Sequence, residues 1–294
     1  MGVEAFRAAV EHEWESLKDG PATLTDEEFN RAASFFTTPP YAAFEREEAN
    51  QALEAQCSAE PIFANWVKRN TRDHKVAGYR SVTISLKPTG VAPGDITAEQ
   101  LDLLADLADT YSFGEIRTTH QQNMVLADVP SASLRELWGE LQGAGLATAN
   151  IGYLTDMICC PGGDYCSLAN AKSIPVAEAI QARFDDLDYV YDLGPLEVNI
   201  SGCMNACGHH HIGHIGILGV DKKGQEFYQV CLGGSQSKQA SIGNILGPSF
   251  KRDDMPDVMG RILSTYVALR KEEETFLDTY RRVGIDPFKE RVYA

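Results

Sequence analysis

The chain has 294 residues, of which 44% are hydrophobic and 23% charged, an ordinary composition for a folded protein with a sizeable core. Its formal net charge of −16 argues against nucleic acid or an anionic membrane as a partner. No stretch approaches the roughly 20 apolar residues of a membrane span, and the first residues lack the basic and apolar regions of a signal peptide. We therefore expect a cytoplasmic protein whose seven cysteines stay reduced or bind metal.

The N-terminal quarter should be partly helical and partly irregular. Residues 2–18 carry apolar side chains at helical spacing, which predicts an amphipathic helix. Residues 19–41 include two consecutive prolines and should be irregular, and residues 43–56 should be helical again. We expect residues 1–74 to form a helical and irregular linker segment.

The middle of the chain has the order of elements of a split βαβ unit. A Thr97–Gln100 capping box predicts where its first helix begins. The expected elements are a strand at 82–86, a helix from 97, strands at 114–119 and 123–129, a helix from 131 and a possible last strand at 146–151. We expect residues 75–150 to form one structural unit.

The C-terminal part should be a mixed α/β domain over residues 151–294. The expected elements are a helix at 175–184, strands at 196–200, 212–220 and 227–232, and one long helix at 254–282. Glycines recur every third residue at Gly213, Gly216 and Gly219, and glycine weakens a strand unless something must approach the backbone closely. Together the two units predict an α+β fold.

Four cysteines form two short pairs in this domain. The pairs are Cys160-x5-Cys166 and, 36 residues later, Cys203-x3-Cys207. Four thiolates on two loops can hold an iron–sulfur cluster, because soft sulfur ligands select iron–sulfur or zinc. Structural zinc favours pairs separated by two to four residues, which the first pair does not match. Spacing alone leaves Cys159 as an alternative to Cys160.

Two further readings of the cysteines remain open at this point. All of them could be small buried residues, although the glycines and prolines around the two pairs indicate exposed loops. Cys57 and Cys231 stand alone and are expected to be core residues.

Several motifs together resemble the sirohaem-containing nitrite and sulfite reductase family. They are the paired cysteines, the run SGCMNACG at 201–208, the run LGGS at 232–235 and the His-rich run ahead of HIGILG at 214–219. The resemblance is greatest to the C-terminal half of bacterial assimilatory sulfite reductase haemoprotein (beta) subunits. The 75–150 unit is similar to that family's ferredoxin-like repeat, including GEIRTT at 114–119. The resemblance makes residues 151–294 a 4Fe–4S and sirohaem-binding domain.

The resemblance also implies site residues. A [4Fe–4S] cluster would be held by Cys160, Cys166, Cys203 and Cys207. The Cys207 thiolate would also be the axial ligand of the sirohaem iron, which makes it catalytic. Asn205 would touch the macrocycle, and Gly208, Gly233 and Gly234 would let a cofactor approach the backbone closely. Arg117 is the candidate catalytic arginine; because Gln121 stands where family members often have a second arginine, a structural or cofactor-edge role for Arg117 is the alternative.

The function implied is six-electron reduction of sulfite to sulfide, with a ferredoxin or an NADPH-dependent flavoprotein as electron donor. The alternatives are a ferredoxin–nitrite reductase, or a non-catalytic iron–sulfur electron-transfer module without sirohaem. Only the second half of the two-half family is matched, so we expect a homologous N-terminal half as partner. The chain is then a fragment or the product of a split gene, and could be inactive alone.

Basic and histidine side chains complete the candidates. Residues 66–75 hold the densest basic cluster, which is either a solvated loop or a patch for cofactor carboxylates or an acidic partner. His209, His210, His211 and His214 could ligate a metal. We expect them instead to pack near the cofactors, with at most one donating a hydrogen bond to a sirohaem carboxylate or a cluster sulfur. His120 is expected to be a surface or subunit-contact residue.

Overall fold

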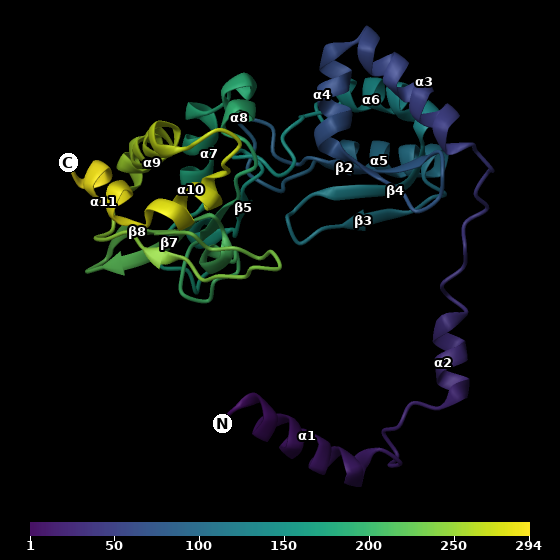
Figure 1. Ribbon diagram of the computed structural model, residues 1–294, viewed down its shortest axis with the longest axis horizontal. Coiled ribbons are helices and arrows are strands. Elements are labelled where there is room, and N and C mark those ends of the chain that lie inside the picture. Colours follow the sequence, from purple (N-terminus) through teal and green to yellow (C-terminus); the bar gives the residue numbers. More distant parts are fainter. The chain divides into compact units, whose positions relative to one another are not determined.

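A computed structural model describes residues 1–294, which divide into two compact units, Met1–Ala42 and Ala43–Ala294. The first unit contains α1 (Val3–Leu17) and α2 (Asp26–Ala33) (Figure 1). The helix expected at 2–18 is confirmed. The expectation that 19–41 is irregular is wrong at α2, because the Thr25 hydroxyl accepts a hydrogen bond from the Glu28 amide at 3.2 Å and caps a helix that begins with three acidic residues.

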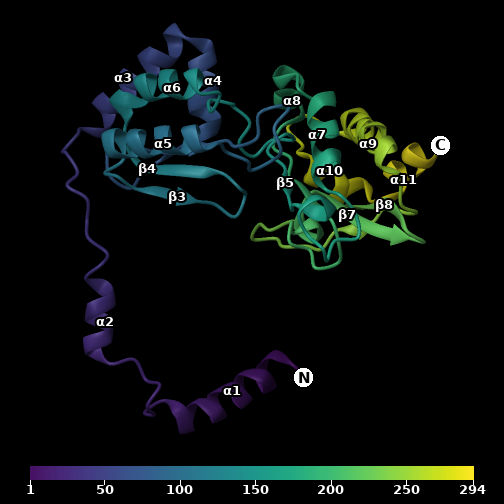
Figure 2. The same ribbon diagram turned by 180° about the vertical axis from the view of Figure 1, so that it is seen from behind.

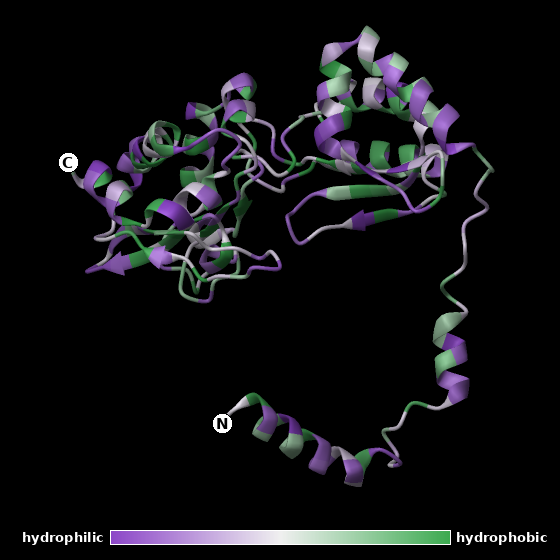
Figure 3. Cartoon of the chain, viewed as in Figure 1, coloured by the Kyte–Doolittle hydropathy of each residue, from purple (hydrophilic) through white to green (hydrophobic).

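The second unit begins with a four-stranded antiparallel sheet in the order β1-β2-β4-β3. Its strands are β1 (Thr71–Asp73), β2 (Tyr79–Ile84), β3 (Ile116–Thr118) and β4 (Met124–Pro130). Its helices are α3 (Arg46–Ala59), α4 (Pro61–Asn70), α5 (Ala98–Tyr111), the short η1 (Ser131–Ser133) and α6 (Leu134–Gly143). The helices gather on one side of the sheet (Figures 1 and 2), and the hydrophobic stretches of α5 and β4 lie next to each other (Figure 3).

The fourth strand of this sheet precedes the unit expected at 75–150 instead of closing it. It is β1, whereas residues 146–150 form no strand, so the possible strand at 146–151 is wrong. Their main-chain groups bond elsewhere: the Leu146 amide donates to the Leu141 carbonyl at 2.8 Å, and the Asn70 side-chain amide donates to the Thr148 carbonyl at 2.9 Å. Of the segment 1–74, expected to be a linker, residues 43–74 belong to the second unit, and Phe63 and Trp66 are fully buried in its core.

The last part of the chain is built on a mixed five-stranded sheet in the order β5-β6-β7-β8-β9. The first three strands are parallel and the remaining pairs antiparallel. The strands are β5 (Ile158–Cys159), β6 (Val198–Ser201), β7 (Ile215–Lys222), β8 (Gln225–Leu232) and β9 (Asn244–Ile245). The helical elements are η2 (Gly162–Asp164), α7 (Ile174–Arg183), α8 (Leu187–Leu193), η3 (His210–Ile212), η4 (Arg252–Asp254), α9 (Met255–Leu269), α10 (Phe276–Val283) and α11 (Asp286–Tyr293).

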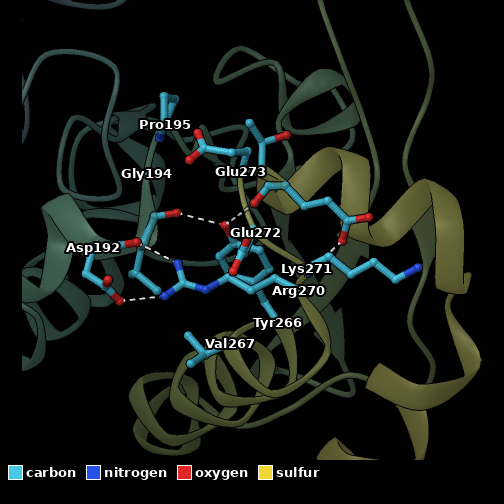
Figure 4. Close-up of a pocket in the computed structure, with 12 residues that line it drawn as sticks. Asp192, Gly194, Pro195, Tyr266, Val267, Arg270, Lys271, Glu272 and Glu273 are labelled. Carbon is cyan, nitrogen blue, oxygen red and sulfur yellow. Dashed lines mark hydrogen bonds and ion pairs between the residues drawn. The ribbon is translucent and has the colours of Figure 1, made fainter.

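The single long helix expected at 254–282 is wrong, because the helix is interrupted between α9 and α10. Arg270 leaves the helical conformation with a ψ of 143°, Glu273 has a φ of 64° within the connecting turn, and Thr275 opens α10 with a capping box to Asp278. The break leaves a cavity of about 620 Å³ beside residues 192–195 (Figure 4). Arg270 crosses it to Asp192 with a 2.7 Å ion pair.

No helix in the chain combines the length and the apolar character that a bilayer crossing requires.

Candidate functional site

The two cysteine pairs follow neighbouring strands of the mixed sheet. β5 and β6 are parallel and in register, with Cys159 opposite Ile200, so both strands end at the same edge. The first residues beyond these ends are bonded to each other. The Cys160 amide donates to the Ile200 carbonyl at 3.0 Å, and the Gly202 amide donates to Cys160 Sγ at 3.1 Å. One thiol of the first pair therefore lies against the residue that precedes Cys203.

The loop that follows Cys166 is also fastened to the second cysteine loop. The amides of Asn170 and Ala171 both donate to the Gly202 carbonyl, at 2.9 and 3.0 Å. Within the first loop, the Cys166 amide donates to the Gly162 carbonyl at 2.9 Å. The backbone thus joins the two cysteine loops independently of any bound group.

The four thiols differ in exposure. Cys203 is buried, Cys160 and Cys166 are half-buried, and Cys207 is exposed. The side chains of Tyr165 and Met204, in the same two loops, are more than four-fifths exposed. No three His, Cys, Asp or Glu side chains are grouped as ligands of a single metal ion. The structure brings the loops together, while the parts that carry Cys166 and Cys207 face outward.

Cys159 and Cys160 lie in different surroundings. Cys159 is 3% exposed in the hydrophobic core, where burial and then the neighbouring Cys160 raise the pKa of its thiol. Its Sγ donates to the Cys160 carbonyl at 3.3 Å. Cys160 Sγ instead faces the second cysteine loop, where it accepts a hydrogen bond from the Gly202 amide at 3.1 Å.

The glycines near the site have reasons in the packing of the protein itself. A Cβ on Gly208 would overlap the Ile200 carbonyl oxygen, and one on Gly233, which has a φ of 86°, would overlap the Tyr280 ring. A Cβ on Gly234 would lie 2.5 to 2.8 Å from the backbone of residues 211–213. The glycines three apart, Gly213, Gly216 and Gly219, also face protein atoms closer than 3.0 Å. Contact of Gly208, Gly233 and Gly234 with a cofactor stays a prediction.

Two further candidates lie at the surface. Asn205 is exposed in the second cysteine loop. Arg117 lies in β3, in the other sheet, with a half-exposed side chain whose Nε is 2.5 Å from Glu115 Oε1. A guanidinium already paired with a carboxylate has part of its charge neutralised. The catalytic role of Arg117 stays a prediction.

The histidine run places one imidazole in the interior. His210 is buried, its Nδ1 has no hydrogen-bond partner, and its ring centroid lies 3.9 Å from that of His211. Burial, and then the charge of His211, lower the pKa of His210 from 6.5 to about 4. His209, His211 and His120 are exposed, whereas His214 Nδ1 accepts the Glu197 amide at 3.3 Å.

Replacement of His210 should flatten the dependence of stability on pH. Unfolded His210 binds a proton near pH 6.5, whereas the folded side chain resists it until about pH 4, so the wild-type chain loses stability as pH falls through this window. Chemical denaturation at pH 7 and pH 5 should show a loss on the order of 2 kcal/mol that His210→Phe lacks. His120→Phe, at an exposed position, should keep it. Equal pH dependence in all three proteins would contradict the assignment.

A buried ion pair beside the cysteine loop was missed in the sequence. Lys87 is fully buried, and its Nζ lies 2.6 Å from Asp156 Oδ1, with the Gln121 carbonyl as a further acceptor. The Asn123 side-chain amide and the Gly152 main-chain amide also donate to Asp156, at 3.0 and 2.8 Å. Lys87 follows β2, and its ammonium group reaches Asp156 in the domain of the mixed sheet.

The basic cluster at 66–75 has two roles in the structure. Arg69 is buried and stacks over the Tyr191 ring at 3.2 Å, so it joins the two domains. Arg72 lines a second cavity of about 210 Å³ between them. Polar groups from both domains share this lining, among them Thr119, Gln121, Asn199 and Gln236. Asp156 and its partners Asn123 and Gly152 line the same cavity, so the Asp156 network forms part of its wall.

Comparison with known families matches both domains. The model of the nitrite/sulfite reductase ferredoxin-like half domain matches residues 73–144, and that of the nitrite and sulphite reductase 4Fe-4S domain matches residues 153–294. The order of these domains confirms the expected α+β fold.

Individual relatives agree. A ferredoxin–nitrite reductase of Synechococcus elongatus is 30% identical over 217 residues, which cover 70% of this chain and 40% of the relative. A ferredoxin-dependent sulfite reductase of Mycobacterium tuberculosis is 31% identical over 229 residues, which cover 74% of this chain and 41% of that relative. The solved NirA protein of that organism matches with a TM-score of 0.59 and 26% identity, covering 74% of this chain and 41% of NirA. The chain thus spans about two fifths of the length of these relatives. It belongs to the sirohaem nitrite and sulfite reductase family, whose members use sirohaem and a 4Fe–4S cluster.

Proposed function

We propose that this chain is the cluster-bearing part of an enzyme that reduces sulfite to sulfide at a sirohaem coupled to a 4Fe–4S cluster. The observation that carries the proposal is the hydrogen bond from the Gly202 amide to Cys160 Sγ, which joins the two cysteine loops. Amide hydrogen bonds to cluster sulfurs are one means by which proteins tune reduction potential. The same bond links the first ligand to the loop that supplies the third and fourth.

The proposed cluster ligands are Cys160, Cys166, Cys203 and Cys207. Four free thiols on two joined loops form a donor set of the soft type that iron–sulfur clusters require. Cys159 is left out because its thiol faces the core. Cys207 is the exposed thiol of the four, which supports its assignment as the ligand shared with the sirohaem iron.

The bound cofactors would supply electrons to the substrate at the sirohaem iron. Sulfite takes up six electrons and seven protons to give the hydrogen sulfide ion and three waters, with reduced ferredoxin or a flavoprotein as the electron source. The chain's part is to hold the cluster ligands in place. The Gly202 main-chain amide, which donates to Cys160 Sγ, would stabilise negative charge on that sulfur.

We propose that a partner supplies the positive charge that a sulfite anion needs. This chain has a net charge of −16, and Arg117 is paired with Glu115. We propose that a homologous N-terminal half provides the cations that bind the anion, since the relatives are about two and a half times as long as the matched region. Asn205, Gly208, Gly233 and Gly234 remain the proposed residues on this chain's side of the sirohaem.

Nitrite is the second candidate substrate. The match to the ferredoxin–nitrite reductase of Synechococcus elongatus supports it as well as the mycobacterial match supports sulfite. Nitrite reduction to ammonium also takes six electrons, with eight protons and release of two waters, so the same ligands would serve either anion.

A visible spectrum of the purified chain, reconstituted anaerobically with iron, sulfide and sirohaem, tests the proposal. We expect a Soret band and a red band from sirohaem over the broad absorption of a cluster. Cys207→Ser should remove the sirohaem bands and deplete the cluster, whereas Cys231→Ser, at a buried position in β8, should retain both. A cluster without sirohaem bands would identify an electron-transfer module instead. Sulfide or ammonium release, assayed with the N-terminal half and reduced viologen, then separates the substrates.

A further inference from the structure

The strand that leads into Cys160 lies at an edge of its sheet. β5 pairs with β6 on one side only, and it is two residues long. A strand edge leaves main-chain donors and acceptors without partners unless other groups supply them. The free side of β5 faces the turn between β3 and β4 of the ferredoxin-like half domain.

One side chain from that turn occupies this free edge. Gln122 Nε2 donates to the Cys159 carbonyl at 2.8 Å, and Gln122 Oε1 accepts from the Cys159 amide at 2.8 Å. A single primary amide thus makes both of the hydrogen bonds that a neighbouring strand would make. Side-chain amides carry a donor and an acceptor in the spacing of a peptide group, which is why one glutamine satisfies both.

The backbone of Gln122 is held in an uncommon conformation. Its φ is 59°, in the left-handed region that residues other than glycine seldom adopt. The Gln122 amide donates to the Thr119 carbonyl at 3.1 Å, and the Asn123 amide donates to Thr119 Oγ1 at 3.0 Å. Such a conformation persists where surrounding bonds fix it, and here it aims the side chain at β5.

The same turn also contacts the start of the segment 156–159, which leads into Cys160. Asn123 Nδ2 donates to Asp156 Oδ1, which also pairs with Lys87. Asp156 and Cys159 are three residues apart, so the half domain fixes both ends of the short segment that delivers Cys160. On the far side of Cys160, its Sγ accepts the Gly202 amide.

We propose that Gln122 is a positioning residue for Cys160. By holding both main-chain groups of Cys159, it sets the direction in which the next thiolate leaves the strand, and thereby one corner of the cluster site. The half domain then acts on the cluster through the backbone of a residue that is not itself a ligand. The proposal rests on the proposed assignment of Cys160 as a ligand.

The sharpest variant is Gln122→Asn. Asparagine keeps the primary amide and tolerates the left-handed backbone well, but its side chain is one methylene shorter and cannot span to Cys159. Gln121→Asn is the matched control, because Gln121 contributes its main-chain carbonyl to the Lys87 network and its side chain makes no bond to β5.

Two measurements test the proposal. Hydrogen exchange of the cluster-free chain should show faster exchange of the Cys159 amide in Gln122→Asn than in the wild type or Gln121→Asn. In the loaded chain, Gln122→Asn should lose its cluster to a chelator roughly tenfold faster, by analogy with other residues that orient metal ligands. It should also shift the cluster's reduction potential and its electron paramagnetic resonance spectrum.

The outcomes separate this proposal from the proposed function. If Gln122→Asn matches Gln121→Asn in exchange, cluster loss and potential while both chains carry a cluster, the positioning role is overturned. If the wild-type chain takes up no cluster, or Cys160→Ala keeps one, the proposed ligand set fails, and the exchange measurement still decides whether Gln122 holds β5. If, among variants at position 122, only glutamine gives the wild-type exchange rate of the Cys159 amide, the positioning role is supported.

Discussion

Replacing Cys160 with alanine should abolish assembly of the 4Fe–4S cluster, whereas replacing Cys159 with alanine should leave the cluster in place. Cys160 Sγ faces the Gly202 amide of the other cysteine loop, while Cys159 lies among hydrophobic side chains with a raised thiol pKa. Three remaining thiolates hold a four-iron cluster poorly. Iron and acid-labile sulfide per chain, with the spectrum of the reduced protein, measure the difference.

The adjacent pair provides its own control for folding. Cys159→Ala removes a buried side chain and should cost on the order of 1 kcal/mol of unfolding free energy, because only a sulfur atom is lost from the core. Cys160→Ala removes a half-buried one and should cost less in the cluster-free chain. A cluster that survives Cys160→Ala and disappears with Cys159→Ala would reverse the ligand assignment.

Replacing Lys87 with methionine should lower the unfolding free energy of the chain by about 3 to 5 kcal/mol. The change keeps the length of the side chain and removes the ammonium group, so the Asp156 carboxylate stays buried without its charged partner. Removing one member of a buried pair is costly for this reason. Denaturant titration of the cluster-free chain, monitored by circular dichroism, gives the value.

Two companion variants make the cause of this loss clear. Lys87→Met combined with Asp156→Asn should recover part of the stability, because the double variant buries no unpaired charge. Arg183→Met removes an ion pair with Asp257 whose side chains are 47% and 65% exposed, and should cost less than about 1 kcal/mol. Equal losses from Lys87→Met and Arg183→Met would show that the Lys87 pair contributes no more than a surface pair.

Elements with local sequence determinants were predicted well. The Thr97–Gln100 capping box is formed, and the helix expected from 131 is α6, which buries Leu134, Leu137, Trp138 and Leu141. The broken helix at 270–275 was missed because the residues Lys271–Glu274 favour a helix, and the break depends on the distant Asp192 and on Arg282. The misplaced fourth strand has the same cause, since sheet partners are chosen by tertiary contacts.

Some features of the candidate site were likewise predictable from the sequence and others were not. The two cysteine pairs, with glycines and prolines around them, predicted two loops, and the parallel pairing of β5 and β6 shows why these loops meet. The choice between Cys159 and Cys160 needed the orientation of β5. Lys87 and Gln122 were beyond sequence reasoning, because a lysine after a strand and a glutamine in a turn are ordinary surface residues until a second domain covers them.

The tight backbone packing around the glycines affects how mutational surveys of such proteins should be interpreted. An alanine at Gly208, Gly216 or Gly233 would collide with a neighbouring carbonyl or aromatic ring before any prosthetic group was met. Colourless protein from such a variant would therefore report a displaced loop and not a lost contact with pigment. Side-chain truncations at the exposed Asn205 and Met204 change the second cysteine loop without such a collision, and are the substitutions from which contact with the chromophore can be inferred.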